Sequence, residues 1–181
     1  MNGFIFLAQP WWVNLLIFVP FIAYYFFRKQ PLAISKNQLL ILACFGIAFG
    51  FVEGAAVVYL RTALGFPANY NPVMYQQAQM LTGLAHNLLT IEFFRELATL
   101  VMLLTVALVA AQKAKERLAI FLWIFAFWDL FYYAGLWLTV RWPSSLTTPD
   151  VLFLIPMPWY AQVWFPILVS LLSISAVIIT S

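Results

Sequence analysis

The chain has 181 residues, of which 65% are hydrophobic and 8% are charged, and its formal net charge at pH 7 is +3. A mean hydropathy of +0.95 leaves too little polar surface for a water-soluble domain of this length, so the composition predicts an integral membrane protein. The basic residues are divided between two loops instead of forming one patch, which argues against a nucleic-acid partner.

Five apolar segments are long enough to cross about 30 Å of hydrocarbon as helices, and none shows the short alternating pattern of a barrel strand. In chain order they are residues 11–27, 38–60, 88–111, 118–140 and 161–180. The sequence therefore predicts an all-α, polytopic membrane helix bundle with about five transmembrane helices, in a single integral membrane domain over residues 1–181. No basic region or small-residue cleavage site accompanies the first segment, so we expect it to remain in the protein.

Six of the nine Lys and Arg residues lie in two of the connections between these segments. They are Arg28, Lys29 and Lys36 in the first connection and Lys113, Lys115 and Arg117 in the third. Because basic loops remain on the cytoplasmic side of a membrane, we expect the N-terminus outside and the C-terminus inside.

The second segment carries a stripe of small residues beside a charge. Gly46, Gly50 and Gly54 recur at four-residue spacing, so they form a smooth helix face that another helix can approach closely. Glu53 borders this stripe, and Arg61 follows eight residues later, about 12 Å along a helix axis, on roughly the same face. The helix-packing face is therefore expected to be the charged face as well.

The third segment contains TIEFFRELAT, in which Glu92 and Glu96 form an i, i+4 pair and Arg95 lies three residues after Glu92. Two carboxylates cannot both ionise cheaply at such close range in a low-dielectric medium. Either a cation such as Arg95 lies between them, or at least one of them is protonated.

The fourth segment contains FWDLFYYAG, in which Asp129 precedes Tyr132 and Tyr133 by one helical turn. Counting inward at about 1.5 Å per residue places the four acids of the apolar segments in the outer half or at the midplane of the bilayer. A charge at the bilayer centre costs at least about 2.5 kcal/mol, so these groups should face the bundle interior. We expect one buried charge cluster, made of Glu53, Arg61, Glu92, Arg95, Glu96, Asp129 and Arg141.

Two interpretations of this cluster remain open. Buried ion pairs can fix helix register without any chemistry. However, the acids outnumber the arginines inside the apolar segments, and such an excess suits proton transfer, a bound cation or general acid–base work. One histidine, His86, and one cysteine, Cys44, exclude a bis-His haem and a Cys-ligated iron–sulfur cluster within this chain. We assign no metal ligand, and the sequence does not identify a cofactor.

Two longer connections, residues 61–87 and 141–160, are expected on the outer side, and the second reads RWPSSLTTPDVLFLIPMPWY. Its Thr-Pro-Asp at 148–150 predicts a helix start, and the apolar run that follows is too short to span a bilayer. We expect an interfacial or re-entrant segment near 149–158 over the outer mouth of the cluster; a loop resting in the headgroups is the alternative. Residues 68–87 predict a partly amphipathic lead-in to the third segment. The candidate outer-mouth residues are His86, Asp150, Tyr132 and Tyr133.

Four runs of residues, FGFVEGAAVVYLR, EFFRELATLVML, FWDLFYY and DVLFLIPMPW, together resemble a family of uncharacterised bacterial polytopic inner-membrane proteins. The resemblance covers about residues 45 to 160 and brings no activity with it. It implies a multi-pass protein in the bacterial cytoplasmic (inner) membrane.

Two classes of function follow from these observations. The small size and the lack of a soluble domain favour a non-catalytic subunit or scaffold of a membrane complex. The alternative is an intramembrane enzyme or a proton- or ion-coupled carrier that uses the carboxylates on a lipid-soluble substrate or cation. A solvent-connected cavity lined by Glu53, Glu92, Glu96 and Asp129 would favour the alternative.

Aromatic residues, at 19% of the chain, exceed what interfacial belts require, so membrane lipids, other membrane subunits or a lipid-soluble ligand are the expected partners.

Overall fold

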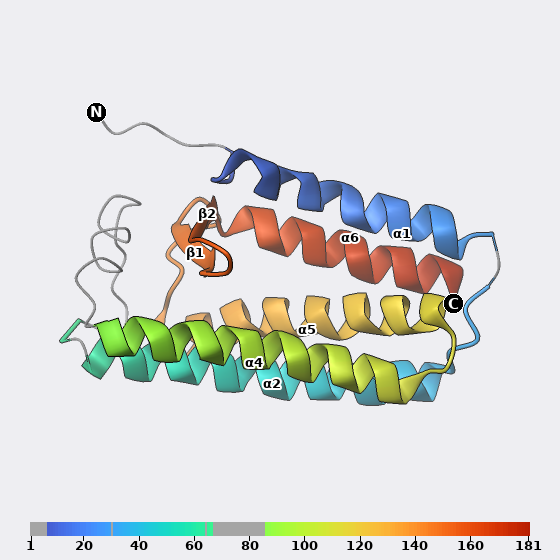
Figure 1. The fold of residues 1–181 in the computed structure, drawn as a ribbon, viewed down its shortest axis with the longest axis horizontal. Coiled ribbons are helices and arrows are strands. Elements are labelled where there is room, and N and C mark those ends of the chain that lie inside the picture. Colours follow the sequence, from blue (N-terminus) through green and yellow to red (C-terminus); the bar gives the residue numbers. More distant parts are fainter. Residues whose placement is uncertain (1–6, 30, 64, 67–85) are drawn as a thin grey trace.

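The computed structural model describes residues 7–29, 31–63, 65–66 and 86–181, with residues 86 and 87 described by their backbone alone. The described helices lie side by side along the long axis, and a β-hairpin lies near one end (Figure 1). The predominantly helical fold expected from the sequence is confirmed. The elements are η1 (Trp11–Phe18), α1 (Val19–Phe27), α2 (Lys36–Ala63), α4 (His86–Ala110), α5 (Ala114–Val140), β1 (Pro149–Phe153), β2 (Trp159–Gln162) and α6 (Trp164–Thr180).

Three of the described helices are long and apolar enough to cross a membrane, as judged from length and composition. They are α2, the Leu88–Ala110 part of α4, and α5. Two shorter apolar helical segments, Trp11–Phe27 and Trp164–Thr180, run alongside them. This arrangement is compatible with a membrane protein.

Helix α5 lies at the centre of the bundle and packs against α2, α4 and α6. The α2 contact is closest where Gly46, Gly50 and Gly54 face α5. A Cβ atom at Gly46 would lie 2.8 Å from the carbonyl oxygen of Ile124, and one at Gly50 would overlap the carbonyl oxygen of Trp128. Because the side chain of glycine is a single hydrogen atom, the two backbones approach more closely here than any larger residue would permit.

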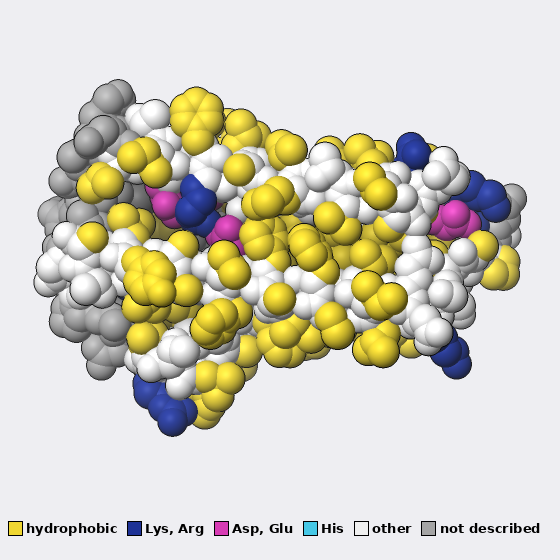
Figure 2. All heavy atoms as spheres, turned by 90° about the horizontal axis from the view of Figure 1, so that it is seen from below, with side chains coloured by type: hydrophobic (Ala, Val, Ile, Leu, Met, Phe, Trp, Pro, Cys, Tyr) yellow, Lys and Arg dark blue, Asp and Glu magenta, His cyan; other side chains and the backbone are white. Residues whose placement is uncertain are grey.

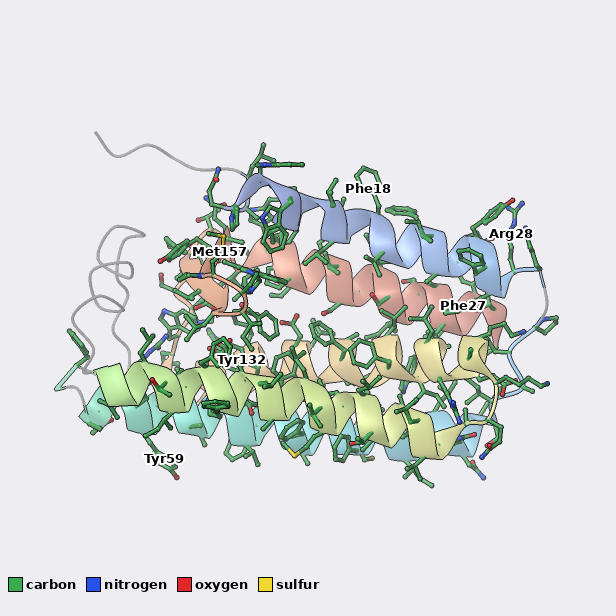
Figure 3. The ribbon with its side chains drawn as sticks, viewed as in Figure 1. Phe18, Phe27, Arg28, Tyr59, Tyr132 and Met157 are labelled. Atoms are coloured by element: carbon green, nitrogen blue, oxygen red, sulfur yellow. The ribbon has the colours of Figure 1, made fainter. Side chains whose placement is uncertain are left out.

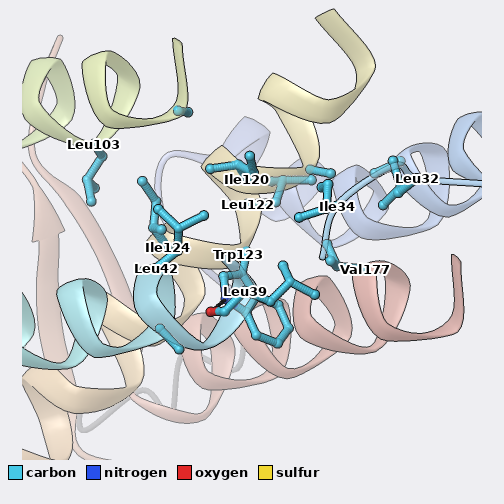
Figure 4. Packing of buried hydrophobic residues seen from close by; sticks show 14 of the residues in the cluster. Leu32, Ile34, Leu39, Leu42, Leu103, Ile120, Leu122, Trp123, Ile124 and Val177 are labelled. Carbon is cyan, nitrogen blue, oxygen red and sulfur yellow. Dashed lines mark hydrogen bonds between the residues drawn. The ribbon is translucent and has the colours of Figure 1, made fainter. Parts of the chain in front are cut away.

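Apolar side chains fill the bundle toward the end at which α5 begins. Figure 4 shows Leu39 and Leu42 of α2 packed with Trp123 and Ile124 of α5, and Val177 of α6 joins the same buried cluster. The indole nitrogen of Trp123 donates a hydrogen bond to the carbonyl oxygen of Leu39 at 2.8 Å. These apolar contacts hold α2, α5 and α6 together at this end of the bundle.

The segment after α5 corrects the all-α expectation. Strands β1 and β2 form an antiparallel hairpin in which Pro149 pairs with Gln162 and Val151 with Tyr160. The predicted helix start at 148–150 is therefore wrong. Valine and phenylalanine favour strands, and pairing with β2 satisfies the backbone groups along one edge of β1. Gln9 extends the pairing through two hydrogen bonds of 2.7 Å with Tyr160.

Charge is distributed unevenly along the long axis. Figure 2 shows hydrophobic side chains over the middle of one face, Lys and Arg side chains around an acidic patch at one end, and, nearer the other end, a spot of acidic and basic side chains and a separate basic patch. The six loop Lys and Arg residues belong to the end at which α1 and α4 finish and α2 and α5 begin. The hairpin lies at the opposite end.

Candidate functional site

A cavity of about 510 Å³ lies between helices α2, α4, α5 and α6 and the hairpin. Along α5 its wall runs from Phe121 to Tyr133, about 18 Å along the helix axis. The two halves of the wall differ in polarity. The polar side chains include Glu53, Arg61, Glu92, Arg95, Glu96, Thr99, Asp129, Tyr132, Tyr133 and Asp150, and the apolar part includes Leu16, Val19, Phe121, Leu122, Phe125 and Val169.

Arg95 of α4 is the centre of one group of ion pairs in this wall. Its guanidinium pairs with Glu53 of α2 and also donates to Glu92, with 3.0 Å between Nε and Oε2. The hydroxyl of Thr99 donates to the second oxygen of Glu53 at 2.6 Å. Both oxygens of Glu53 are thereby satisfied, and α2 is tied to α4 although the two helices share few backbone contacts.

Glu96 of α4 faces the hairpin. The backbone N–H of Leu154 donates to its Oε2 at 2.7 Å, and the residue is only 9% exposed. Within the described residues, no Lys or Arg lies within ion-pair distance of Glu96. Its other oxygen, Oε1, has no hydrogen-bond donor in the described part of the chain.

Asp129 of α5 faces α6 and, like Glu96, receives one hydrogen bond from a neighbouring element. The hydroxyl of Ser170 donates to its Oδ2 at 2.8 Å, and Asp129 is 8% exposed. Among residues 7–29, 31–63, 65–66 and 86–181, no donor reaches Oδ1 of Asp129, and none reaches the hydroxyl of Tyr132. Figure 3 places Tyr132 between the α4 ribbon and the hairpin, where the cavity lies.

Asp150 of strand β1 is the carboxylate that the hairpin contributes to the cavity wall. The Tyr133 hydroxyl donates to Oδ2 of Asp150 at 2.8 Å, and the residue is buried. Burial raises the pKa of the Asp150 carboxyl to about 6, although the Arg61 guanidinium and the hydrogen bond from Tyr133 oppose that rise. Arg61 itself stacks on the Trp142 ring, with 4.2 Å from its guanidinium carbon to the ring centroid.

Two of the predicted residues are not placed in this wall. Arg141 ends α5 in the left-handed conformation, and its side chain turns back over the Trp137 ring at 4.7 Å. It forms no ion pair with any described carboxylate. His86 begins α4, but its side chain is outside the described residues, as is the expected lead-in at 68–87 apart from the backbone of its last two residues.

Sequence reasoning missed the hydrogen-bond donors of the site. Thr99 lies one turn after Arg95, and Ser170 is a polar position inside an apolar helix; both were visible as interruptions of apolar runs. The backbone N–H of Leu154 left no signal in the sequence, because only the folded hairpin brings it to Glu96.

The cavity wall contains more carboxylates than guanidinium groups. Five carboxylates line the cavity, from Glu53, Glu92, Glu96, Asp129 and Asp150, against the two guanidinium groups of Arg61 and Arg95. In the described part of the chain no group of three or more His, Cys, Asp or Glu side chains is close enough to hold a metal ion. The arrangement therefore offers separate hydrogen-bond acceptors rather than a chelating set.

Comparisons of the chain with protein-family models, curated proteins and solved structures find no match.

Proposed function

We propose that this protein binds an amphipathic, lipid-soluble molecule in the cavity between α2, α4, α5, α6 and the hairpin. One observation carries the proposal: in a largely apolar cavity of about 510 Å³, Glu96 and Asp129 are nine-tenths buried, and each has one carboxylate oxygen that no donor from the described residues reaches. Small-molecule sites have volumes of about 300 to 1,000 Å³ and apolar walls with a few convergent polar groups.

A purely structural role accounts for only part of the site. Glu53, Glu92 and Arg95 satisfy one another and fix α2 against α4, as a register-setting ion pair would. Glu96 and Asp129 each receive one hydrogen bond from the described residues and form no ion pair with them. Both residues line the cavity, so a bound molecule that donates hydrogen bonds to their second oxygens accounts for polar side chains in a largely apolar wall better than packing does.

The membrane arrangement belongs to the same proposal. We infer a multi-pass protein of the bacterial cytoplasmic membrane, forming one membrane domain, with the N-terminus outside and the C-terminus inside. The two 17-residue helical segments beside the three long helices support five spans. The gathering of basic residues at one end supports the orientation. The polar end of the cavity then lies in the outer half of the bilayer.

Filling the cavity tests the binding function. Val169 of α6 lines the apolar part of the cavity, whereas Leu171 on the same helix is exposed. We expect the wild-type protein and Leu171→Trp, purified in a mild detergent, to release the same small molecule in stoichiometric amount on organic extraction, as measured by mass spectrometry. Val169→Trp should fold but release none, because the indole occupies the space. Equal release from both variants would contradict the proposal.

A second candidate function is a non-catalytic subunit of a membrane complex. Helix α4 favours it, because large apolar side chains such as Ile91, Phe94 and Val109 are exposed along it. Cross-linking from a photoreactive group at Phe94 in intact membranes should then capture one protein in constant ratio to this chain. Labelling of lipid alone would remove this candidate and leave the binding proposal in place.

A further inference from the structure

We propose that the molecule bound in this cavity is a lipophilic cation, such as a long-chain alkylamine, whose ammonium group lies among Glu96, Asp129 and Asp150. The inference rests on the binding function proposed above and assigns the chemistry of the ligand's head group.

The charge balance of the wall supports a positive head group. Of the two guanidinium groups in the wall, that of Arg95 is engaged by Glu53 and Glu92, and that of Arg61 stacks on Trp142 while its charge acts on Asp150. Ionised carboxylates only accept hydrogen bonds, and an ammonium group only donates them. A charge-assisted hydrogen bond is roughly twice as strong as a neutral one, so a cation is the best complement to the oxygens of Glu96 and Asp129 that receive no hydrogen bond from the described residues.

Aromatic rings provide an independent argument. Trp128 and Tyr132 lie on either side of Asp129 in the α5 sequence, and both line the cavity together with Tyr133 and Trp159. The faces of such rings attract cations, and recognition of ammonium ligands commonly uses them. Acidic groups and aromatic rings in the same wall favour an ammonium over an uncharged donor.

The apolar part of the cavity fits the rest of such a molecule. Phe121 and Phe125 of α5 extend the wall toward the end at which α5 begins, and Leu16 of η1 and Val169 of α6 also line this part. No Asp, Glu, Lys or Arg is among the lining residues of this part. A hydrocarbon chain can therefore continue from the acidic end along α5 while its head group remains between α4, α5 and the hairpin.

An anionic lipid is disfavoured by the same groups. A carboxylate or phosphate head would face Glu96, Asp129 and Asp150 in a low-dielectric site, where like charges repel strongly. A neutral alcohol could donate one hydrogen bond but would leave the remaining acceptors unsatisfied. The expected order of affinity is therefore amine, then alcohol, then carboxylate, at equal chain length.

Three probes with the same chain test the inference: dodecylamine, 1-dodecanol and dodecanoate. Binding is measured by titration calorimetry on the whole protein in nanodiscs of zwitterionic lipid, with empty nanodiscs subtracted. We expect dodecylamine to bind at least about tenfold more tightly than 1-dodecanol, and dodecanoate to show no binding. Glu96→Gln and Asp129→Asn should each weaken the amine about tenfold and leave the alcohol unchanged, which also shows that these variants fold.

Glu116→Gln is the matched control, because Glu116 is a buried carboxylate at the opposite end of α5, outside the cavity; amine binding should be unchanged. Equal binding of amine and alcohol, or amine binding unaffected by Glu96→Gln and Asp129→Asn, would overturn the cation assignment and leave the binding function intact. Absence of binding by all three probes, together with equal extracts from Val169→Trp and Leu171→Trp, would overturn the binding function itself.

Discussion

Asp150 lies in strand β1, outside the long helices, and joins the hairpin to the cavity wall. Burial raises the pKa of its carboxyl from the usual 3.8 to about 6. Between these values the folded protein retains a proton that the unfolded chain has lost, so the contribution of Asp150 to stability falls as the pH rises from about 4 to about 6. Asp150→Asn should remove this part of the pH dependence.

Thermal unfolding in detergent, followed across this pH window, measures the effect. Other buried acids titrate in both proteins, so the informative quantity is the Tm of the wild type minus that of Asp150→Asn, which should decrease as the pH rises. Two parallel Tm profiles would show that the carboxyl is not protonated in the folded state.

The contact between α2 and α5 requires glycine at position 50 more strictly than at position 54, one helical turn later. A Cβ at Gly50 would meet backbone atoms of Trp128 and Tyr132, which cannot move aside, whereas a Cβ at Gly54 would lie 3.4 Å from the carbonyl oxygen of Tyr132, an ordinary contact. Gly50→Ala should therefore lower the free energy of unfolding by about 1 to 3 kcal/mol. Gly54→Ala should remain within about 1 kcal/mol of the wild type, on the stabilising side, because alanine favours helices.

The two alanine variants control for each other, since they differ only in position along one helix face. Expression, monodispersity and Tm in detergent would report the difference. Equal Tm values for the two variants would mean that the helices separate slightly without cost, and would contradict the close contact.

The helices could be predicted because their signals are local. Apolar runs predict their approximate bounds, and the periodicity of an α-helix places Gly46, Gly50 and Gly54 on one face. The partner of that face could not be predicted, because α2 packs on α5, which is distant in sequence. The hairpin was missed for a related reason. Thr-Pro-Asp at 148–150 is a helix-start pattern, but pairing with residues 159–162 decides the structure.

The same distinction between local and long-range contacts applies to the site. Glu92 and Arg95 are neighbours on one helix, so their contact follows from i, i+3 spacing. The pairing of Arg95 with Glu53 and the hydrogen bond from Ser170 to Asp129 join different helices. Sequence spacing gives the position of such residues along their own helix, but it does not show which residues of different helices are in contact. The cavity itself is a property of how all the elements pack, and no run of residues encodes it.

The long axis of the molecule has one basic end and one end that carries the hairpin. Arg28, Lys36 and Lys115 mark the basic end, and the connection through Ser145 belongs to the hairpin end. Moving a cluster of Lys and Arg across a membrane is unfavourable, so we expect the basic end in the cytoplasm. An alkaline phosphatase fusion should be active after Ser145 and inactive after Lys115, and a cytoplasmic reporter should show the opposite. The reverse pattern would place the acidic end of the cavity in the inner half of the bilayer, so that a cationic ligand would enter from the cytoplasmic leaflet.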